Sequence, residues 1–123
     1  MYLCIAIFYL KHINMNTDNS QAQMRKGVLE LCILSILAKE DSYVPDIIDK
    51  LKESKLIVVE GTLYPLMTRL KNDGFLTYNW EESRSGPPRK YYKLTALGKT
   101  LLKDQKKSWD DLVDSVNKIV YSK

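Results

Sequence analysis

The sequence predicts a mainly α-helical (α+β) fold of three helices, a two-stranded hairpin and a long C-terminal helix. Two observations carry this prediction. Apolar residues recur with helical spacing through residues 24–74 and again through residues 95–121, whereas residues 75–94 alternate and are rich in aromatic side chains. At 123 residues the chain is long enough for one compact domain with an added oligomerisation arm.

The first 14 residues, MYLCIAIFYLKHIN, differ from the rest of the chain. Their apolar run is far shorter than the ~20 residues that cross a bilayer. They also lack the basic segment and cleavage site of a secretory signal, and Met15 then opens a polar stretch. We therefore treat residues 1–23 as a leader in which residues 1–14 are an over-extended start. The alternative is a short helix or strand that adds to an interface.

Charge and cysteine content narrow the function classes. A net charge of +4 and a pI near 9.0 favour a polyanionic partner only weakly, so the position of the charge matters more. Cys4 and Cys32 are far apart, which predicts neither a metal site nor a disulfide framework. We expect a cytoplasmic protein with inert thiols, no membrane segment and no cofactor.

The first helix is expected over residues 24–39, and it is apolar almost all round between Val28 and Ala38. A helix without a polar face must be covered on every side. In a small protein this favours contact with both its own domain and a partner subunit.

A second helix should follow residues 40–42, whose side-chain oxygens are suited to an N-cap. Pro45 fits its first turn, where the missing N–H removes no hydrogen bond. Ile47, Ile48 and Leu51 supply one apolar stripe, and the helix should end near residue 54.

A third helix is expected from Glu60 to residues 73–74, with Gly74 as a left-handed C-cap. Its apolar residues fall at the spacing of one buried face: Leu63, Leu66, Met67 and Leu70. The other face carries hydroxyls, an aromatic ring and a guanidinium, which suit base edges and phosphates. Pro65 on that face should lie in the first turn, because further in it would remove a helix hydrogen bond.

Residues 75–80 and 91–94 predict the two strands of a hairpin, joined by a turn at residues 86–88, Gly-Pro-Pro. Residues 84–93 contain four basic residues and no acidic one. Alone, a basic tip is often only a solvated loop. When a basic tip follows a helix that has one apolar face and ends at a glycine, phosphate contact is favoured.

The last helix should begin after Thr95 and reach about residue 121. Its apolar residues resemble the seam of a coiled coil, interrupted at Gln105, and predict a dimer interface. The residues of this seam are Leu102, Trp109, Leu112, Val116 and Ile119.

Three helices followed by a hairpin is the order of a winged helix-turn-helix. We expect this DNA-binding domain over residues 24–94 and a C-terminal dimerisation helix over residues 95–123. Four motifs carry a closer resemblance: EGTLYPL at residues 60–66, DGFL at 73–76, GPPRKYY at 86–92 and LTALG at 94–98. Together they resemble the PadR family of transcriptional regulators, in its compact subfamily.

The resemblance implies a homodimer that binds pseudo-palindromic operators as a repressor and is released by a small molecule. In compact, multidrug-sensing members a tryptophan of the last helix stacks on flat ligands, and Trp109 occupies the matching place. Its alternative role is ordinary packing in the dimer seam. The contacts expected with double-stranded DNA are Arg25, Tyr43, Thr62, Tyr64, Pro65, Arg69, Arg84, Arg89 and Lys90.

An enzyme is not expected. The only histidine, His12, lies in the leader, and the sequence shows no nucleophile–base pair or Gly-rich phosphate loop. The remaining rival is a winged-helix module that binds protein or RNA, because a fold alone does not settle function.

Overall fold

The computed structural model describes residue 24 and residues 27–123. The chain divides into two units, residues 1–30 and residues 31–123. The described residues of the first unit are helical, and residues 31–39 of the second unit are helical as well. The expected leader and Arg25 lie outside the described residues.

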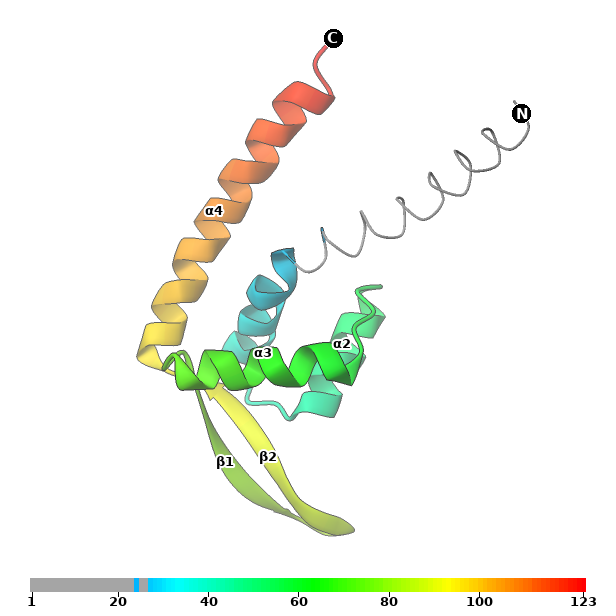
Figure 1. The fold of residues 1–123 in the computed structure, drawn as a ribbon, viewed down its shortest axis with the longest axis vertical. Coiled ribbons are helices and arrows are strands. Elements are labelled where there is room, and N and C mark those ends of the chain that lie inside the picture. The colour runs from blue at the N-terminus through cyan, green and yellow to red at the C-terminus, as the bar shows by residue number, and fades with distance from the viewer. Residues whose placement is uncertain (1–23, 25–26) are drawn as a thin grey trace, which may run out of the picture. The chain divides into compact units, whose positions relative to one another are not determined.

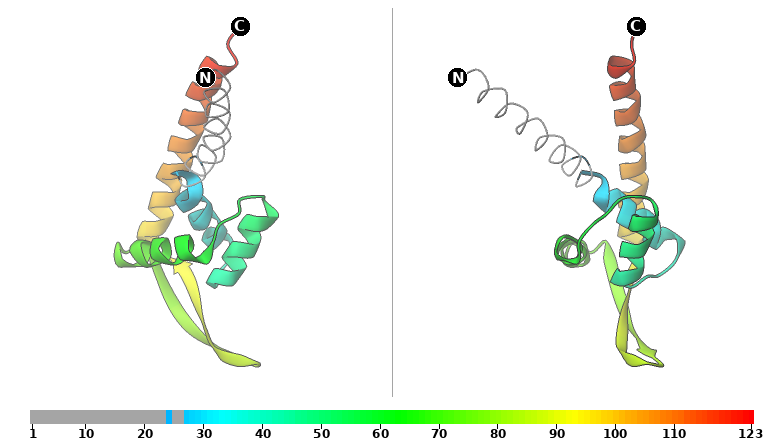
Figure 2. Two further views of the ribbon diagram at one scale, coloured as in Figure 1. Left: turned by 45° about the vertical axis from the view of Figure 1, so that its right-hand side comes forward. Right: turned by 90° about the vertical axis from the view of Figure 1, so that its right-hand side faces the viewer.

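The second unit contains the predicted elements in the predicted order (Figure 1). Residues 31–39 are followed by α2 (Val44–Glu53), α3 (Glu60–Asn72), β1 (Leu76–Ser83), β2 (Gly86–Leu94) and α4 (Ala96–Val120). α3 packs against α2 and β1, and β2 contacts α2 and α4. The antiparallel hairpin extends beyond these helices, as Figure 2 shows from two further directions. The predicted fold class, a winged helix-turn-helix with a long C-terminal helix, is confirmed.

The core of the second unit takes one buried face from each element. Its fully buried side chains are those of Ile33, Leu34, Ile47, Leu51, Leu63, Met67 and Leu70. Leu76 and Leu94 at the base of the hairpin and Leu102 of α4 close this core with 3–6% of their surface exposed. Leu102 was assigned to the dimer seam, but its side chain is already buried within the chain.

The N-terminus of α2 differs from the expectation. The N-cap is Tyr43, which makes no side-chain cap hydrogen bond, and Pro45 lies in the first turn as predicted. Ser42 instead pairs with β2, where the two residues Ser42 and Tyr92 exchange backbone hydrogen bonds of 3.2 and 2.8 Å. The Ser42 hydroxyl donates to the carbonyl of Glu40. A tertiary backbone pairing therefore overrides the local capping preference.

α2 and α3 end in the same way. The amide of Phe75 donates to the carbonyl of Leu70, and that of Gly74 to Lys71. With Gly74 at φ 87° this is a Schellman motif and confirms the predicted C-cap. Lys55 takes the same left-handed position after α2, with φ 64°, although it carries a side chain.

Pro65 lies in the second turn of α3, six residues into the helix, so its expected place in the first turn was wrong. Without an N–H, Pro65 leaves the carbonyl of Gly61, four residues earlier, without a helix partner. Both residues are exposed, so water can satisfy that carbonyl.

The hairpin turn also differs from the expectation. The two turn residues are Arg84 and Ser85, and β2 already begins at Gly86. Pro87 and Pro88 lie within β2. Opposite them on β1, the pairing register shifts between Glu81 and Ser83. A proline without an N–H is tolerated at such an irregularity on an edge strand.

α3 and α4 are joined by a compact junction. The Thr95 hydroxyl donates to the carbonyl of Gly74 at 2.6 Å and caps α4 by accepting from the amide of Gly98 at 3.0 Å. The amide of Thr95 donates to the carbonyl of Phe75. A Cβ added to Gly98 would lie 2.1 Å from that carbonyl oxygen, so only glycine allows this approach. We call these contacts the α3–α4 junction.

Candidate nucleic-acid interface

The outward face of α3 is polar and solvent-accessible. Its inner face is held by the buried Leu63, Met67 and Leu70. The predicted contact residues Thr62, Tyr64, Pro65 and Arg69 are all exposed, as is Thr68. Arg69 lies 3.8 Å from the carboxylate of Asp73 one turn further along the helix. The inner residues therefore fix the orientation in which α3 presents its polar face.

The hairpin β1–β2, which we call the wing, carries the predicted basic residues in different environments. Arg84 at the turn is exposed, and so is Arg89 on β2. Lys90 is half-buried and belongs to the opposite face of the wing, because successive strand residues point to opposite faces. The four basic residues of the wing therefore do not form one surface.

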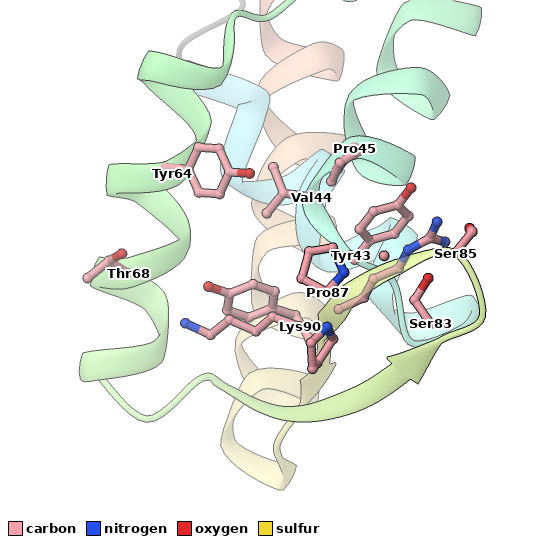
Figure 3. Close-up of a pocket in the computed structure, with 13 residues that line it drawn as sticks. Tyr43, Val44, Pro45, Tyr64, Thr68, Ser83, Ser85, Pro87 and Lys90 are labelled. Carbon is pink, nitrogen blue, oxygen red and sulfur yellow. The ribbon is translucent and has the colours of Figure 1, made fainter.

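α3, the start of α2 and the wing enclose an open groove of about 520 Å³, which we call the wing groove. Figure 3 shows Tyr64 and Thr68 on α3 across this groove from Pro87 and Lys90. Tyr43 lines the same groove beside the wing. The structure thus brings together predicted residues from three elements, and it adds Thr68, which lies one turn after Tyr64 on the same helix face.

Tyr43 contacts the wing within the chain. Its ring lies 5.6 Å from the ring of Tyr91, and the guanidinium of Arg89 lies 4.9 Å from its centroid. A guanidinium stacked on a ring keeps its N–H edge available for an anion. Burial and the neighbouring Asp49 raise the pKa of the Asp46 carboxyl, while Lys50 and Arg89 act in the opposite direction. Arg89 therefore stacks on the Tyr43 ring, and its charge stabilises the ionised form of Asp46.

Lys90 lies among aromatic rings that sequence reasoning did not connect with it. Its ammonium group is 3.9 Å from the centroid of Tyr78, 5.3 Å from Tyr92 and 5.9 Å from Trp80. The alternation of residues 76–80 and 90–94 contained the signal, but the strand register was needed to align them.

α4 exposes the remaining residues of the predicted seam. Trp109, Leu112, Val116 and Ile119 are 42–79% exposed and recur at intervals of three and four residues; we call them the α4 stripe. Gln105, at the interruption of the seam, has its Oε1 atom buried without a hydrogen-bond partner among the described residues.

Two kinds of site find no support within the described part of the chain. No group of three or more His, Cys, Asp or Glu side chains in it could hold a metal ion. No helix in the same residues is long and apolar enough to cross a membrane.

Burial raises the pKa of the Cys32 thiol, which disfavours the reactive thiolate.

Comparison with known proteins gives a consistent result. Residues 33–104 match the model of the transcriptional regulator PadR-like family. A PadR-like transcription factor from Bacteroides fragilis is 60% identical, with a TM-score of 0.69 over 83% of this chain and 99% of that one.

Two further crystal structures are similar. A PadR family transcriptional regulator from Eggerthella lenta is 32% identical, with a TM-score of 0.76 over 87% of this chain and 90% of that one. A PadR-like transcriptional regulator from Bacillus cereus is 36% identical, with a TM-score of 0.74 over 82% of this chain and 99% of that one. With its polar α3 face, its wing and its long α4, the chain belongs to the PadR-like family of transcriptional regulators.

Proposed function

We propose that the protein is a homodimeric repressor that binds double-stranded operator DNA, with α3 in the major groove and the wing beside it. One observation carries this proposal: Tyr64 and Thr68 of α3 share the wing groove with Arg89 of the wing. Hydroxyl and aromatic side chains on a helix suit base edges, and the cations of a neighbouring hairpin suit the sugar–phosphate backbone. Such a repressor acts in the cytoplasm, where it reaches the DNA.

The α4 stripe supports the dimer. Four large apolar side chains on one helix face remain 42–79% exposed in the single chain. Burying such side chains against a second copy removes apolar surface from water and adds stability that a small domain lacks. A two-fold axis along this contact sets two copies of α3 about one DNA turn, roughly 34 Å, apart. A pseudo-palindromic operator follows from this symmetry.

Release of the operator by a small flat ligand is the part of the proposal that rests on family resemblance. Trp109 is 42% exposed on the α4 stripe, which leaves a large ring face for stacking. A ligand that favours one angle between subunits shifts the spacing of the two α3 helices and so the affinity for DNA. Quenching of Trp109 emission by planar aromatics supports this role, whereas unchanged emission across a broad panel assigns Trp109 to dimer packing.

A competition assay tests the proposed function. The wild-type protein is titrated into fluorescent duplex DNA from immediately upstream of its own gene, with random duplex and single-stranded RNA as competitors. We expect a complex of two protomers per duplex that random duplex displaces only at large excess and RNA does not displace. Displacement by RNA at equal concentration, or equal affinity for random duplex, would contradict operator binding.

A matched pair of variants locates the contact. Tyr64→Ala should reduce operator affinity roughly tenfold, as expected for the loss of one good groove contact. Tyr121→Ala removes a ring of the same type that is 77% exposed just after α4, and it should leave the affinity unchanged. Equal effects of both changes would place the contact elsewhere.

A further inference from the structure

The face of the wing that carries Lys90 is an aromatic ladder. The paired residues along it are Leu76 with Leu94, Tyr78 with Tyr92, and Trp80 with Lys90. Burial decreases in that order, from the buried leucines to Trp80, which is 63% exposed. Lys90 therefore takes the place of a fourth ring at the outer end of the ladder.

The rings and the ammonium group form one connected cluster. The Tyr78 ring lies 5.8 Å from that of Tyr92 and meets the Trp80 ring edge-on at 6.2 Å. The ammonium of Lys90 lies within 6 Å of all three centroids, which is the range in which a ring attracts a cation. Its carbon stem is half-buried against the same face.

The cluster also reaches α3. The ammonium of Lys71, in the last turns of that helix, lies 5.5 Å from the centroid of Tyr78. Tyr78 thus receives one cation from α3 and one from β2. The Lys71 contact opposes a change in the distance between the wing and α3, because such a change separates its ammonium from the ring. The Lys90 contact lies within the wing and holds the Tyr78 ring itself.

We propose that Lys90 is a positioning residue, whose ammonium, held by Tyr78, Tyr92 and Trp80, fixes the Tyr78 ring that Lys71 of α3 contacts and so holds the wing in place beside α3. This inference rests on the proposed DNA binding and changes the role first expected for Lys90, which was a phosphate contact. A phosphate contact would draw the ammonium away from the rings. Arg84 has no ring contact within the described residues, and Arg89 stacks on Tyr43 with its N–H edge available. The arginines of the wing therefore supply its phosphate contacts.

The free protein provides the first test. A side chain held over an aromatic ring has its terminal methylene protons shifted upfield in the NMR spectrum. Lys93, exposed on the opposite face of the wing, is the internal reference. We expect an upfield Hε signal for Lys90 that Tyr78→Leu moves toward the position of Lys93, with the remaining shift due to Tyr92 and Trp80. A Lys90 signal already at the Lys93 position in the wild-type protein would overturn the inference.

The salt dependence of operator binding provides the second test, since each phosphate contact contributes about 0.9 to the slope of log K against log salt concentration. Lys90→Met should weaken binding about fivefold at every salt concentration and leave the slope unchanged. Arg84→Met, the matched control, should lower the slope by about 0.9. Lys90→Arg, which keeps a cation on the rings, should restore affinity.

The two tests separate this inference from the proposed function. A slope lowered by about 0.9 in Lys90→Met would make Lys90 a phosphate contact and overturn the positioning role. An absence of specific binding by the wild-type protein would overturn the proposed function, whereas the NMR shift of Lys90 decides its contact with the rings independently.

Discussion

Gly98 is the residue whose smallest change should disturb the molecule most. It lies in the first turn of α4, where its Cα faces the backbone of Phe75, between α3 and β1. An added methyl group would lie 2.1 Å from the carbonyl oxygen of Phe75, 3.1 Å from its carbonyl carbon and 3.3 Å from Leu94. Gly98→Ala therefore requires α4 to move away from the α3–α4 junction.

The magnitude follows from three contributions. The nearest contact must widen from 2.1 Å to at least 3.0 Å, and overpacking of this kind costs about 1–3 kcal/mol. Such a shift also breaks the two hydrogen bonds that Thr95 donates to Gly74 and Phe75, at about 1 kcal/mol each. Alanine regains about 1 kcal/mol of helix propensity over glycine. The free energy of unfolding should fall by about 2–4 kcal/mol, which corresponds to a Tm lower by roughly 10 °C.

Urea denaturation followed by circular dichroism at a fixed protomer concentration measures this change. Gly61→Ala is the matched control, because it places the same methyl group in a helix where nothing beyond the adjacent helix backbone lies within 4 Å. It should leave stability unchanged or raise it by up to about 1 kcal/mol. An unchanged or higher unfolding free energy for Gly98→Ala would refute the steric reasoning.

Three further outcomes are expected. Arg89→Ala should weaken binding to operator and random duplex alike and lower the salt slope by about 0.9, whereas Lys118→Ala on α4 should leave the slope unchanged. Equal slopes for both variants would exclude Arg89 as a phosphate contact. Lys55→Gly should raise the unfolding free energy by roughly 1 kcal/mol, because Lys55 has the left-handed φ of 64°, which is unfavourable for a residue with a side chain. A less stable variant would show that the Lys55 side chain stabilises the fold by more than this backbone conformation costs. Thr95→Val should lower that free energy by about 1–2 kcal/mol through loss of the α4 cap, and Thr95→Ser should not; similar losses for both would argue against the hydroxyl.

The elements were predictable because their signals are local. The periodicity of Leu63, Met67 and Leu70 identified the buried face of α3, and Gly74 identified its end. The last helix was predicted to begin after Thr95, and the Thr95 hydroxyl caps α4 by accepting a hydrogen bond from the amide of Gly98.

The errors occurred where tertiary contacts override local preference. Ser42 has a capping side chain, but its backbone pairs with Tyr92, which sets the start of α2 one residue later. Pro65 is tolerated inside α3 because that face is exposed. The Gly-Pro-Pro segment suggested a turn, yet Arg84 and Ser85 form it and the prolines continue an edge strand.

The candidate site was predictable as a set of residues but not as a geometry. Tyr64, Arg84 and Arg89 are exposed where DNA contact was expected. The alternation of residues 76–80 and 90–94 did not by itself place Lys90 over Tyr78, since that contact depends on the strand register and on the side-chain direction. Leu102 shows the same limit, because its helical spacing fits the intrachain core and a dimer seam equally well.

A footprint of the wild-type protein on the DNA upstream of its own gene tests the central claim most directly. Two α3 helices related by a two-fold axis should protect two inverted half-sites whose centres are about one DNA turn, roughly 34 Å, apart. Protection of a single half-site, or uniform protection without a preferred sequence, would contradict a dimeric operator-binding repressor.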